Sequence, residues 1–265
     1  MNLEILTQQV IDLSKEVGAF IRGEAATFKA SDIEYKGHSD LVSYVDKTAE
    51  EKIVKRLVEL LPEAGFITEE KTINKTGEVY NWIVDPLDGT TNFIHGLPIF
   101  SVSIALEKNK ELVLGVVYEI NLDECFYAWK DGGAYVNGKP IKVSPHAEFS
   151  KTLIATGFPY YNFDKEDQYL QIVKELMQQC HGIRRMGSAA VDMAYVACGR
   201  FDAYFEYNIN LYDIAAGVVL VREAGGTAFN FSGEDEFFSS REVIASNGKI
   251  GEAMKEVVQK HFFKD

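Results

Sequence analysis

Hydrophobic patterning changes near Ser144 and divides the chain into two parts of different fold class. Before that residue, apolar segments of strand length follow one another, separated by turn signals at Lys108-Asn109, Asn121-Leu122, Asp131-Gly132 and Asn137-Gly138. After it, strand-like and helix-like segments alternate, which is typical of an α/β arrangement. The sequence therefore predicts an N-terminal α+β part with a largely antiparallel sheet at residues 1–143 and a C-terminal α/β part at residues 144–265.

The N-terminal part is expected to begin with two amphipathic helices. Apolar side chains recur at spacings of three and four through residues 3–20, and a second such segment starts near Asp46 and stops near Pro62. Two short buried strands, "FITEE" and "YNWIVDP", should follow, joined by a polar, hairpin-like insert around residues 74–77. These elements predict a helix pair that covers one face of the sheet.

The C-terminal part is expected to form a sheet with helices packed against it. The predicted strands are "TLIATGF", "GIRRMG" at an edge, "RFDAYFE", "TAFNF" and "EVIAS", and the predicted helices are "DQYLQIVKELMQQC", "SAAVDMAYVACG" and "YDIAAGVVLVREAGG". Gly199 and Gly225-Gly226 are placed as helix ends. No linker rich in Pro, Gly or Ser separates the two parts, so we expect one compact unit.

Composition excludes several classes of function. The 265 residues are 46% hydrophobic, enough for a core, and the formal net charge is −13 without any block rich in Lys or Arg. Such a surface repels nucleic acid and anionic membranes. No apolar run approaches a membrane span, and the N-terminus lacks the pattern of a signal peptide. With three widely spaced cysteines, Cys125, Cys180 and Cys198, read as buried free thiols, we expect a cytoplasmic protein.

The stretch "NWIVDPLDGTTNF" carries the strongest chemical signal. Asp85 ends an apolar strand, and Pro86 should stop the strand from continuing its ladder. Leu87 then offers a backbone carbonyl, Asp88 a second carboxylate, and residues 89–91 the N–H groups of a helix start. Carboxylates beside a carbonyl suit a hard cation such as Mg²⁺, while N–H groups at a helix start suit phosphate.

A plainer interpretation of this stretch stays open. Asp88-Gly89 could be an ordinary turn in which Asp88 caps the helix that follows. Two carboxylates this close repel each other unless a cation lies between them, which favours a metal site. From the stretch alone, the two interpretations are evenly matched.

Three more acidic positions add to the pattern. Glu69 lies at the end of the "FITEE" strand, where an uncompensated carboxylate is costly. Asp213 and Asp46 each come immediately before a predicted helix. Taken singly, each is better explained as a solvated strand end or a helix cap.

Five ordered segments resemble the inositol monophosphatase family of Mg²⁺-dependent, lithium-sensitive sugar phosphatases, and its bacterial branch in particular. They are "SDLVSYVDKTAEEKI", "ITEE", "WIVDPLDGTTNF", "GSAAVDMAYVACGRFDAYFE" and "LYDIAAGVVLVREAGG". The match covers nearly the whole chain. It implies a five-layered αβαβα sandwich, with a metal site at the seam between the two halves.

The resemblance also implies roles for individual residues. Glu69, Asp85 and the Leu87 carbonyl would hold a first Mg²⁺, Asp85, Asp88 and Asp213 a second, and Glu69 a weaker third. Phosphate and substrate would be bound by Gly89, Thr90, Glu206 and Asp213. Catalytic roles fall to Glu69, Thr90 and Asp46, with Asp46 supporting the Thr90 hydroxyl that touches the attacking water.

By resemblance, the reaction is hydrolysis of a small phosphate monoester, most simply inositol monophosphate, by direct attack of a metal-activated water. No Ser or Cys nucleophile is needed. Other substrates of the superfamily stay open: 3′-phosphoadenosine 5′-phosphate, fructose 1,6-bisphosphate or a nicotinamide dinucleotide phosphate. A regulatory role through a protein partner is a further alternative. The family's habit implies a homodimer.

The sequence departs from the family's pattern without losing a ligand. Tyr212 stands where a Trp is usual, Leu87 where Ile is commoner, and "ATGFPYYN" resembles the bacterial branch, so the pocket around the alcohol could differ. His95 is disfavoured as a general acid. The pair Arg184-Arg185 could reach a substrate or a partner but is better explained as a solvated edge, and Lys36 is left out of the binding set.

Overall fold

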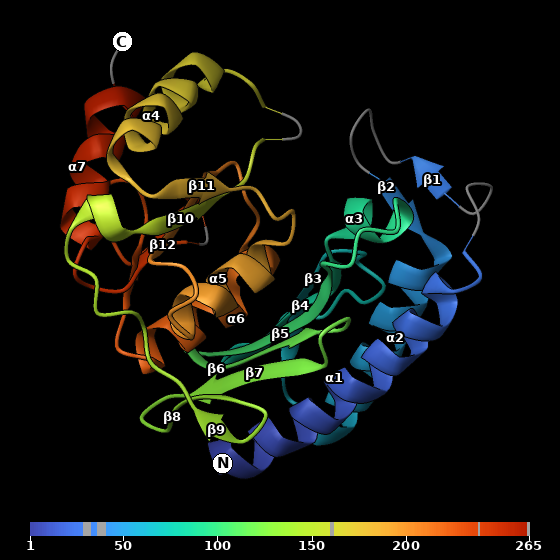
Figure 1. Cartoon of the computed structure of the whole chain (residues 1–265). Helices are drawn as coiled ribbons and strands as arrows, with labels where there is room; N and C mark the ends of the chain where they lie inside the picture. The colour runs from blue at the N-terminus through green and yellow to red at the C-terminus, as the bar shows by residue number, and fades with distance from the viewer. Residues whose placement is uncertain (29–32, 36–40, 160–161, 238, 264–265) are drawn as a thin grey trace.

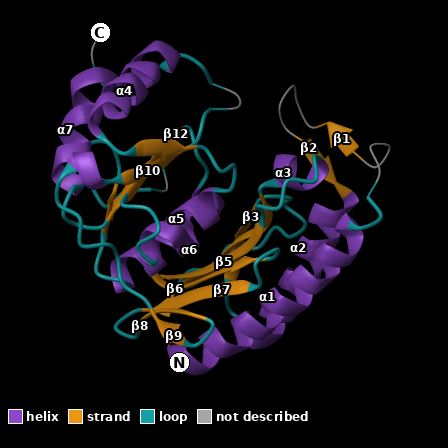
Figure 2. Ribbon diagram, viewed as in Figure 1, coloured by secondary structure: helices purple, strands orange, loops and turns teal. Residues whose placement is uncertain are grey.

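The computed structural model describes residues 1–28, 33–35, 41–159, 162–237 and 239–263, and arranges them in five layers (Figures 1 and 2). Helices α1 (Leu3–Ala25) and α2 (Tyr44–Leu60) form one outer layer and cover a seven-stranded sheet. Helices α5 (Ala189–Ala197) and α6 (Leu211–Glu223) lie between that sheet and a five-stranded one, which α4 (Glu166–Gln179) and α7 (Gly251–Phe262) cover. The predicted αβαβα sandwich is confirmed.

The seven-stranded sheet is built as predicted from a chain of hairpins. Its strands follow sequence order: β3 (Gly65–Thr68), β4 (Tyr80–Asp88), β5 (Ser101–Lys108), β6 (Glu111–Glu119), β7 (Glu124–Trp129), β8 (Gly133–Val136) and β9 (Lys139–Pro140). From β4 onward every neighbouring pair is antiparallel. Asn109, Asp131 and Asn137 adopt left-handed backbone angles at the predicted turns, which Asn and Asp tolerate better than most residues.

Two predictions about this sheet are wrong. Strands β3 and β4 pair in parallel, so the segment between them crosses back along the sheet and is not a hairpin. Strand β4 also does not stop at Pro86. Its ladder with β5 is interrupted between Asp85 and Asp88 and resumes where Asp88 pairs with Ser101, because a bulge accommodates the proline that cannot donate a ladder bond.

The five-stranded sheet is mixed. Its order is β11 (Gly182–Arg184), β10 (Leu153–Thr156), β12 (Ala203–Tyr207), β14 (Glu242–Ser246) and β13 (Thr227–Phe229). Strand β10 pairs in parallel with β11 and β12, whereas β12, β14 and β13 are antiparallel. The predicted edge strand and both predicted closing strands are confirmed. Helix α7 was not predicted.

Helices α5 and α6 fill the space between the two sheets because their small residues allow close approach. A methyl group added at Gly217 of α6 would lie 2.5 Å from Cβ of Met193 on α5, and one at Gly115 of β6 would lie 2.5 Å from the Ala216 carbonyl oxygen. Both halves therefore meet in one buried apolar cluster. The division of the chain at residue 143 into two subdomains stays a prediction.

The remaining described elements are short. A two-stranded ribbon, β1 (Ile33–Tyr35) and β2 (Leu41–Ser43), precedes α2, and a single 3-10 turn, η2 (Phe149–Lys151), precedes β10. All three cysteines are free thiols as predicted, although only Cys125 is fully buried. Within the described ranges, none of the helices combines the length and apolarity that crossing a bilayer requires.

Candidate active site

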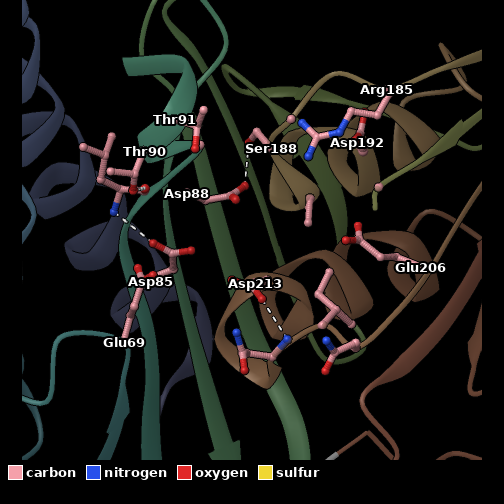
Figure 3. A pocket seen from close by; sticks show the side chains of 18 residues that line it. Glu69, Asp85, Asp88, Thr90, Thr91, Arg185, Ser188, Asp192, Glu206 and Asp213 are labelled. Atoms are coloured by element: carbon pink, nitrogen blue, oxygen red, sulfur yellow. Dashed lines mark hydrogen bonds between the residues drawn. The ribbon is translucent and has the colours of Figure 1, made fainter. Parts of the chain in front are cut away.

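A cavity opens at the seam between the two halves, with an empty volume of about 810 Å³ that includes its open mouth. One wall comes from the loop after β3, the end of β4 and the short helix α3 (Thr90–Ile94); the other comes from the β11–α5 loop, β12 and the start of α6 (Figure 3). Glu69, Asp85, Leu87, Asp88, Gly89, Thr90, Glu206 and Asp213 all line it. The structure thus brings together every predicted site residue except Asp46, which lies just behind Thr90.

Three aspartates at this seam lie close together, and the backbone holds each of them in the same way. Asp85, Asp88 and Asp213 each offer a carboxylate oxygen, and these oxygens lie within 4.8 Å of one another. In each residue one oxygen accepts a hydrogen bond from a backbone N–H: from Leu87 at 3.0 Å, Ala190 at 2.8 Å and Asn210 at 2.8 Å, respectively. The backbone therefore fixes each carboxylate. Such a group could hold a metal ion.

Asp88 and Asp213 are positioned by helix N-termini. Asp88 accepts hydrogen bonds from the Ser188 hydroxyl and from the Ala190 N–H at the start of α5. Asp213 is the third residue of α6 and forms a capping box with Asn210, so the expectation that it precedes the helix is corrected. The same correction applies to Asp46, the third residue of α2, which forms a capping box with Ser43.

The prediction that Asp88 could cap the helix after it is wrong: α3 has no side-chain cap, and Asp88 bonds to the start of α5 instead. For Asp213, a capping role and a place in a metal site are compatible, and the metal site stays a prediction. Asp213 caps a helix with one carboxylate oxygen and faces the other acids with its remaining capacity. A capping role does not remove a residue from a metal site, because a carboxylate has two oxygens and about four lone-pair positions.

Burial and mutual repulsion make this cluster a poor place for uncompensated charge. Burial raises the pKa of Asp88 to about 6, and burial together with the nearby Asp88 charge raises the pKa of Asp213 to about 7. The pKa values of Glu69 and Asp85 are raised well above their ordinary range by burial and by the charges of the neighbouring acids. A cation placed among these side chains would reverse each of these shifts.

Glu69 provides a test of whether the residues fit a metal. Its Oε2 atom is buried and has no hydrogen-bond partner, which is costly for a carboxylate oxygen. Figure 3 shows the Glu69 side chain beside that of Asp85, on the same wall of the cavity. Carboxylate oxygens and a backbone carbonyl are the ligands that Mg²⁺ prefers, so the donor set and the unpartnered oxygen both fit that ion.

Thr90 is held so that its oxygen can accept a hydrogen bond from a bound water. Its hydroxyl lies 2.9 Å from Oδ1 of Asp46 and 3.0 Å from the Leu87 carbonyl oxygen. A hydroxyl has one proton, and the carboxylate is the stronger acceptor. With that proton given to Asp46, the Thr90 oxygen and the Leu87 carbonyl are both available toward the cavity.

Glu206 faces the acidic wall from strand β12 (Figure 3). It accepts a hydrogen bond from the Tyr204 hydroxyl, and burial raises its pKa to about 8. The backbone of Gly157 lies against it so closely that an added methyl group would be 1.9 Å from Oε2. The glycine therefore leaves the space that this carboxyl occupies.

Two residues of the cavity were not among the predicted site residues. Asp192 lies on α5, is 2% exposed, and leaves Oδ1 without a hydrogen-bond partner. A charged residue inside the otherwise apolar helix "AAVDMAYVA" is costly unless it has a function, and that signal was available. Arg185 is exposed, as expected of an edge, yet it lines the cavity beside Asp192 (Figure 3).

Other weighed residues lie elsewhere. His95 is exposed and does not line the cavity. Arg184 does not line the cavity, and Lys36 falls outside the described residues. Tyr212 packs at the edge of the apolar cluster between the sheets, consistent with a ring-for-ring packing change.

The sequence was compared with known protein families, and the family described as "Inositol monophosphatase family" matches residues 2–262. The chain belongs to the inositol monophosphatase family. Proteins named inositol monophosphatases are phosphoric monoester hydrolases, and this chain is an enzyme of that class.

Members of the inositol monophosphatase family from several bacteria are similar along almost their full length. An inositol-1-monophosphatase of Rhizobium meliloti is 38% identical, with 97% of this chain and 96% of that protein aligned. A fructose-1,6-bisphosphatase/inositol-1-monophosphatase of Aquifex aeolicus is also 38% identical, over 91% of each chain. The solved structure of the extragenic suppressor protein suhB from Bartonella henselae is 36% identical, with a TM-score of 0.89 over 97% of this chain and 99% of that one.

Proposed function

We propose that this enzyme hydrolyses a small polyol phosphate monoester, foremost inositol monophosphate, in a Mg²⁺-dependent reaction. The observation that carries the proposal is the fixed cluster of Asp85, Asp88 and Asp213, whose facing carboxylate oxygens lie within 4.8 Å of one another. Uncompensated, these charges would destabilise the fold. Divalent cations would neutralise the cluster, and the bound cations would in turn attract a phosphate dianion.

The proposed ligand sets follow from what each side chain presents. Glu69, Asp85 and the Leu87 carbonyl would hold one Mg²⁺, and Asp85, Asp88 and Asp213 a second; Glu69 would also serve a weaker third. When bound, these ions neutralise phosphate charge and lower the pKa of a water molecule. Support comes from the unpartnered Glu69 Oε2 and from the Leu87 carbonyl beside the Thr90 hydroxyl.

The protein's own groups would place the phosphate and the water. Gly89 and Thr90 lie at the start of α3, and their backbone N–H groups are proposed to bind phosphate oxygens. The Thr90 hydroxyl, with its proton given to Asp46, would accept a hydrogen bond from the attacking water. Glu69 would help to orient the same water. Because water would attack the phosphorus atom directly, the alcohol would leave without formation of a covalent enzyme intermediate.

The alcohol end of the cavity suits a polyol. Glu206 and Asp192 present carboxyl groups there, and carboxyl groups both accept and, when protonated, donate hydrogen bonds to hydroxyls. Burial raises the pKa of Glu206 to about 8 and raises the pKa of Asp192 above its ordinary range, which favours the neutral form of each. A substrate with several hydroxyl groups would satisfy the Asp192 oxygen that the protein leaves unpartnered.

A second candidate is an ester with a further anionic group, such as fructose 1,6-bisphosphate. Arg185 favours it, because a guanidinium at the cavity wall can meet a second phosphate. The relative from Aquifex aeolicus carries both activities in its name. The predicted homodimer, lithium sensitivity and cytoplasmic location stay predictions.

A panel of esters tests both candidates. Phosphate release is measured for inositol 1-phosphate, fructose 1,6-bisphosphate, 3′-phosphoadenosine 5′-phosphate and NADP, with Mg²⁺, with EDTA and with added lithium. We expect inositol 1-phosphate to have the highest kcat/KM, EDTA to abolish turnover and lithium to reduce it. Release from none of the esters in the presence of Mg²⁺ would overturn the proposal. A bisphosphate preference that Arg185→Gln removes would instead select the second candidate.

A further inference from the structure

Glu50 on helix α2 is a completely buried carboxylate outside the cavity that is tied to one turn of the chain. Its Oε1 accepts hydrogen bonds from the Thr68 hydroxyl at 2.9 Å, the Thr72 N–H at 2.8 Å and the Thr72 hydroxyl at 2.7 Å. Its Oε2 accepts one from the Glu70 N–H at 2.7 Å. All of these donors lie on residues within three positions of Glu69.

These contacts decide where the Glu69 side chain can lie. The Glu69 N–H itself makes only one long backbone bond, 3.3 Å to the Val84 carbonyl oxygen. Two residues on, Lys71 has a φ of 55°, in the left-handed region that a lysine seldom adopts. A turn of this kind persists only where its surroundings over-determine it. Four hydrogen bonds to one buried charge provide that constraint.

The placement of Glu50 on its helix adds a second link to the site. Glu50 lies four residues after Asp46, and residues at that spacing share one face of a helix. Asp46 holds the Thr90 hydroxyl at 2.9 Å, while Glu50 holds the turn that carries Glu69. One face of α2 therefore fixes both residues that are proposed to orient the attacking water.

We propose that Glu50 is a positioning residue: through the Glu70 and Thr72 hydrogen bonds it holds Glu69 in place to bind Mg²⁺. The inference rests on the proposed Mg²⁺ site. If Glu50 were only a structural residue, its replacement would lower stability and leave Mg²⁺ affinity unchanged. A positioning role predicts weakened Mg²⁺ binding in protein that remains folded.

The test is Mg²⁺ binding by isothermal titration calorimetry to the metal-free full chain, with wild type beside Glu50→Gln. Glutamine keeps the shape of the side chain. Both oxygens of Glu50 accept hydrogen bonds from N–H or hydroxyl groups, whereas the NH₂ group of glutamine cannot accept any. We expect Mg²⁺ affinity to fall by about 10- to 100-fold, the usual effect of removing a partner that orients a ligand. The Mg²⁺ concentration for half-maximal turnover should rise in parallel, with substrate KM at saturating Mg²⁺ little changed.

Thr72→Val is a milder variant that guards against misfolding. It removes one hydroxyl donor to Glu50 from an exposed position and leaves the Thr72 N–H in place. We expect a smaller loss of Mg²⁺ affinity in the same direction. If Thr72→Val and folded Glu50→Gln both bind Mg²⁺ as tightly as wild type, Glu50 has no positioning role.

Glu119→Gln is the matched control. Glu119 is also a buried glutamate that holds a turn through backbone donors, including the Asn121 N–H at 3.2 Å, but it lines no part of the cavity. Its variant should lose stability without any change in Mg²⁺ affinity; an equal loss of affinity in Glu119→Gln would reduce the Glu50 effect to general destabilisation. Failure of wild type itself to bind Mg²⁺ would mark failure of the proposed function instead.

Discussion

At the scale of single residues, the acids of the cavity owe their positions to one repeated arrangement. Asp85, Asp88 and Asp213 each bind a backbone N–H through one oxygen, so each side chain is fixed without help from any ligand. Such prior fixing lowers the entropy lost when an ion binds. It also stores unfavourable electrostatic free energy in the ion-free protein, because the fixed charges cannot move apart.

Replacement of Asp88 tests this arrangement at its centre. Asp88→Asn keeps the shape and one oxygen, but it removes the negative charge that faces Asp213. We expect kcat to fall by about 100-fold or more, the usual cost of losing one pre-organised charge at a transition state. Steady-state kinetics at saturating Mg²⁺ measures it, and full turnover in this variant would remove Asp88 from the metal site.

At the scale of elements, the alcohol side of the cavity depends on two neighbouring strands. Glu206 lies on β12, and Gly157 follows β10, which pairs with β12 in parallel. Because the strands are adjacent and run the same way, the backbone at Gly157 passes directly beside the Glu206 carboxyl group. A residue without a side chain is needed there.

Gly157→Ala is expected to displace Glu206 and to leave the fold intact. The added methyl group would meet the far end of a side chain rather than backbone, and that end can rotate away. Loss of one hydrogen bond between Glu206 and the substrate corresponds to a KM for the polyol ester raised by about tenfold. Kinetics beside a melting curve measures both effects.

Gly23→Ala on α1 is the matched control, because an added methyl group there meets nothing within 4 Å. It should raise the melting temperature slightly and leave KM unchanged. An unchanged KM in Gly157→Ala as well would show that Glu206 does not contact the substrate.

Local features of the elements could be predicted from the sequence, whereas contacts between distant elements could not. Asp85 and Asp88 were predicted as a pair because they are close along the chain, and the turns of the hairpins were predicted because Asn and Gly determine them locally. The parallel pairing of β3 with β4 was not, because the direction in which the chain re-enters a sheet leaves no local pattern in the polar segment between the two strands. Asp192 could have been singled out, because it is a charged residue in an otherwise apolar helix; its place in the cavity could not, because nearly all of α5 is buried and its periodicity does not show which side faces the cavity.

At the scale of the whole molecule, the cavity couples stability to pH. Burial raises the pKa of Asp88 to about 6, and burial with the Asp88 charge raises that of Asp213 to about 7, both from 3.8. Burial raises the pKa of Glu206 from 4.5 to about 8. Between the ordinary and the raised values, the folded state binds more protons than the unfolded state. Stability contributed by these groups is therefore fully present below about pH 4 and is lost as the pH rises toward 8.

Melting curves in EDTA and in Mg²⁺ test this coupling. In EDTA, we expect these groups to lower the melting temperature as pH rises from 5 to 8, at about 2–4 °C for each kcal/mol lost. With saturating Mg²⁺, the fall should shrink or reverse, because the ion binds the deprotonated carboxylates and stabilises the folded state.

A triple variant with Asp85, Asp88 and Asp213 changed to Asn is the control for the melting curves. It should lose most of the difference between EDTA and Mg²⁺. The same dependence on pH and Mg²⁺ in that variant would place its origin outside these three aspartates.

The most direct measurement is anomalous diffraction from crystals grown with Mn²⁺, an ion that takes the same oxygen ligands as Mg²⁺. We expect anomalous peaks among the carboxylates of Asp85, Asp88 and Asp213, with Glu69 Oε2 and the Leu87 carbonyl bound to one of the ions. A map without peaks among these groups, from protein that hydrolyses a phosphate ester in the same Mn²⁺ buffer, would contradict this expectation.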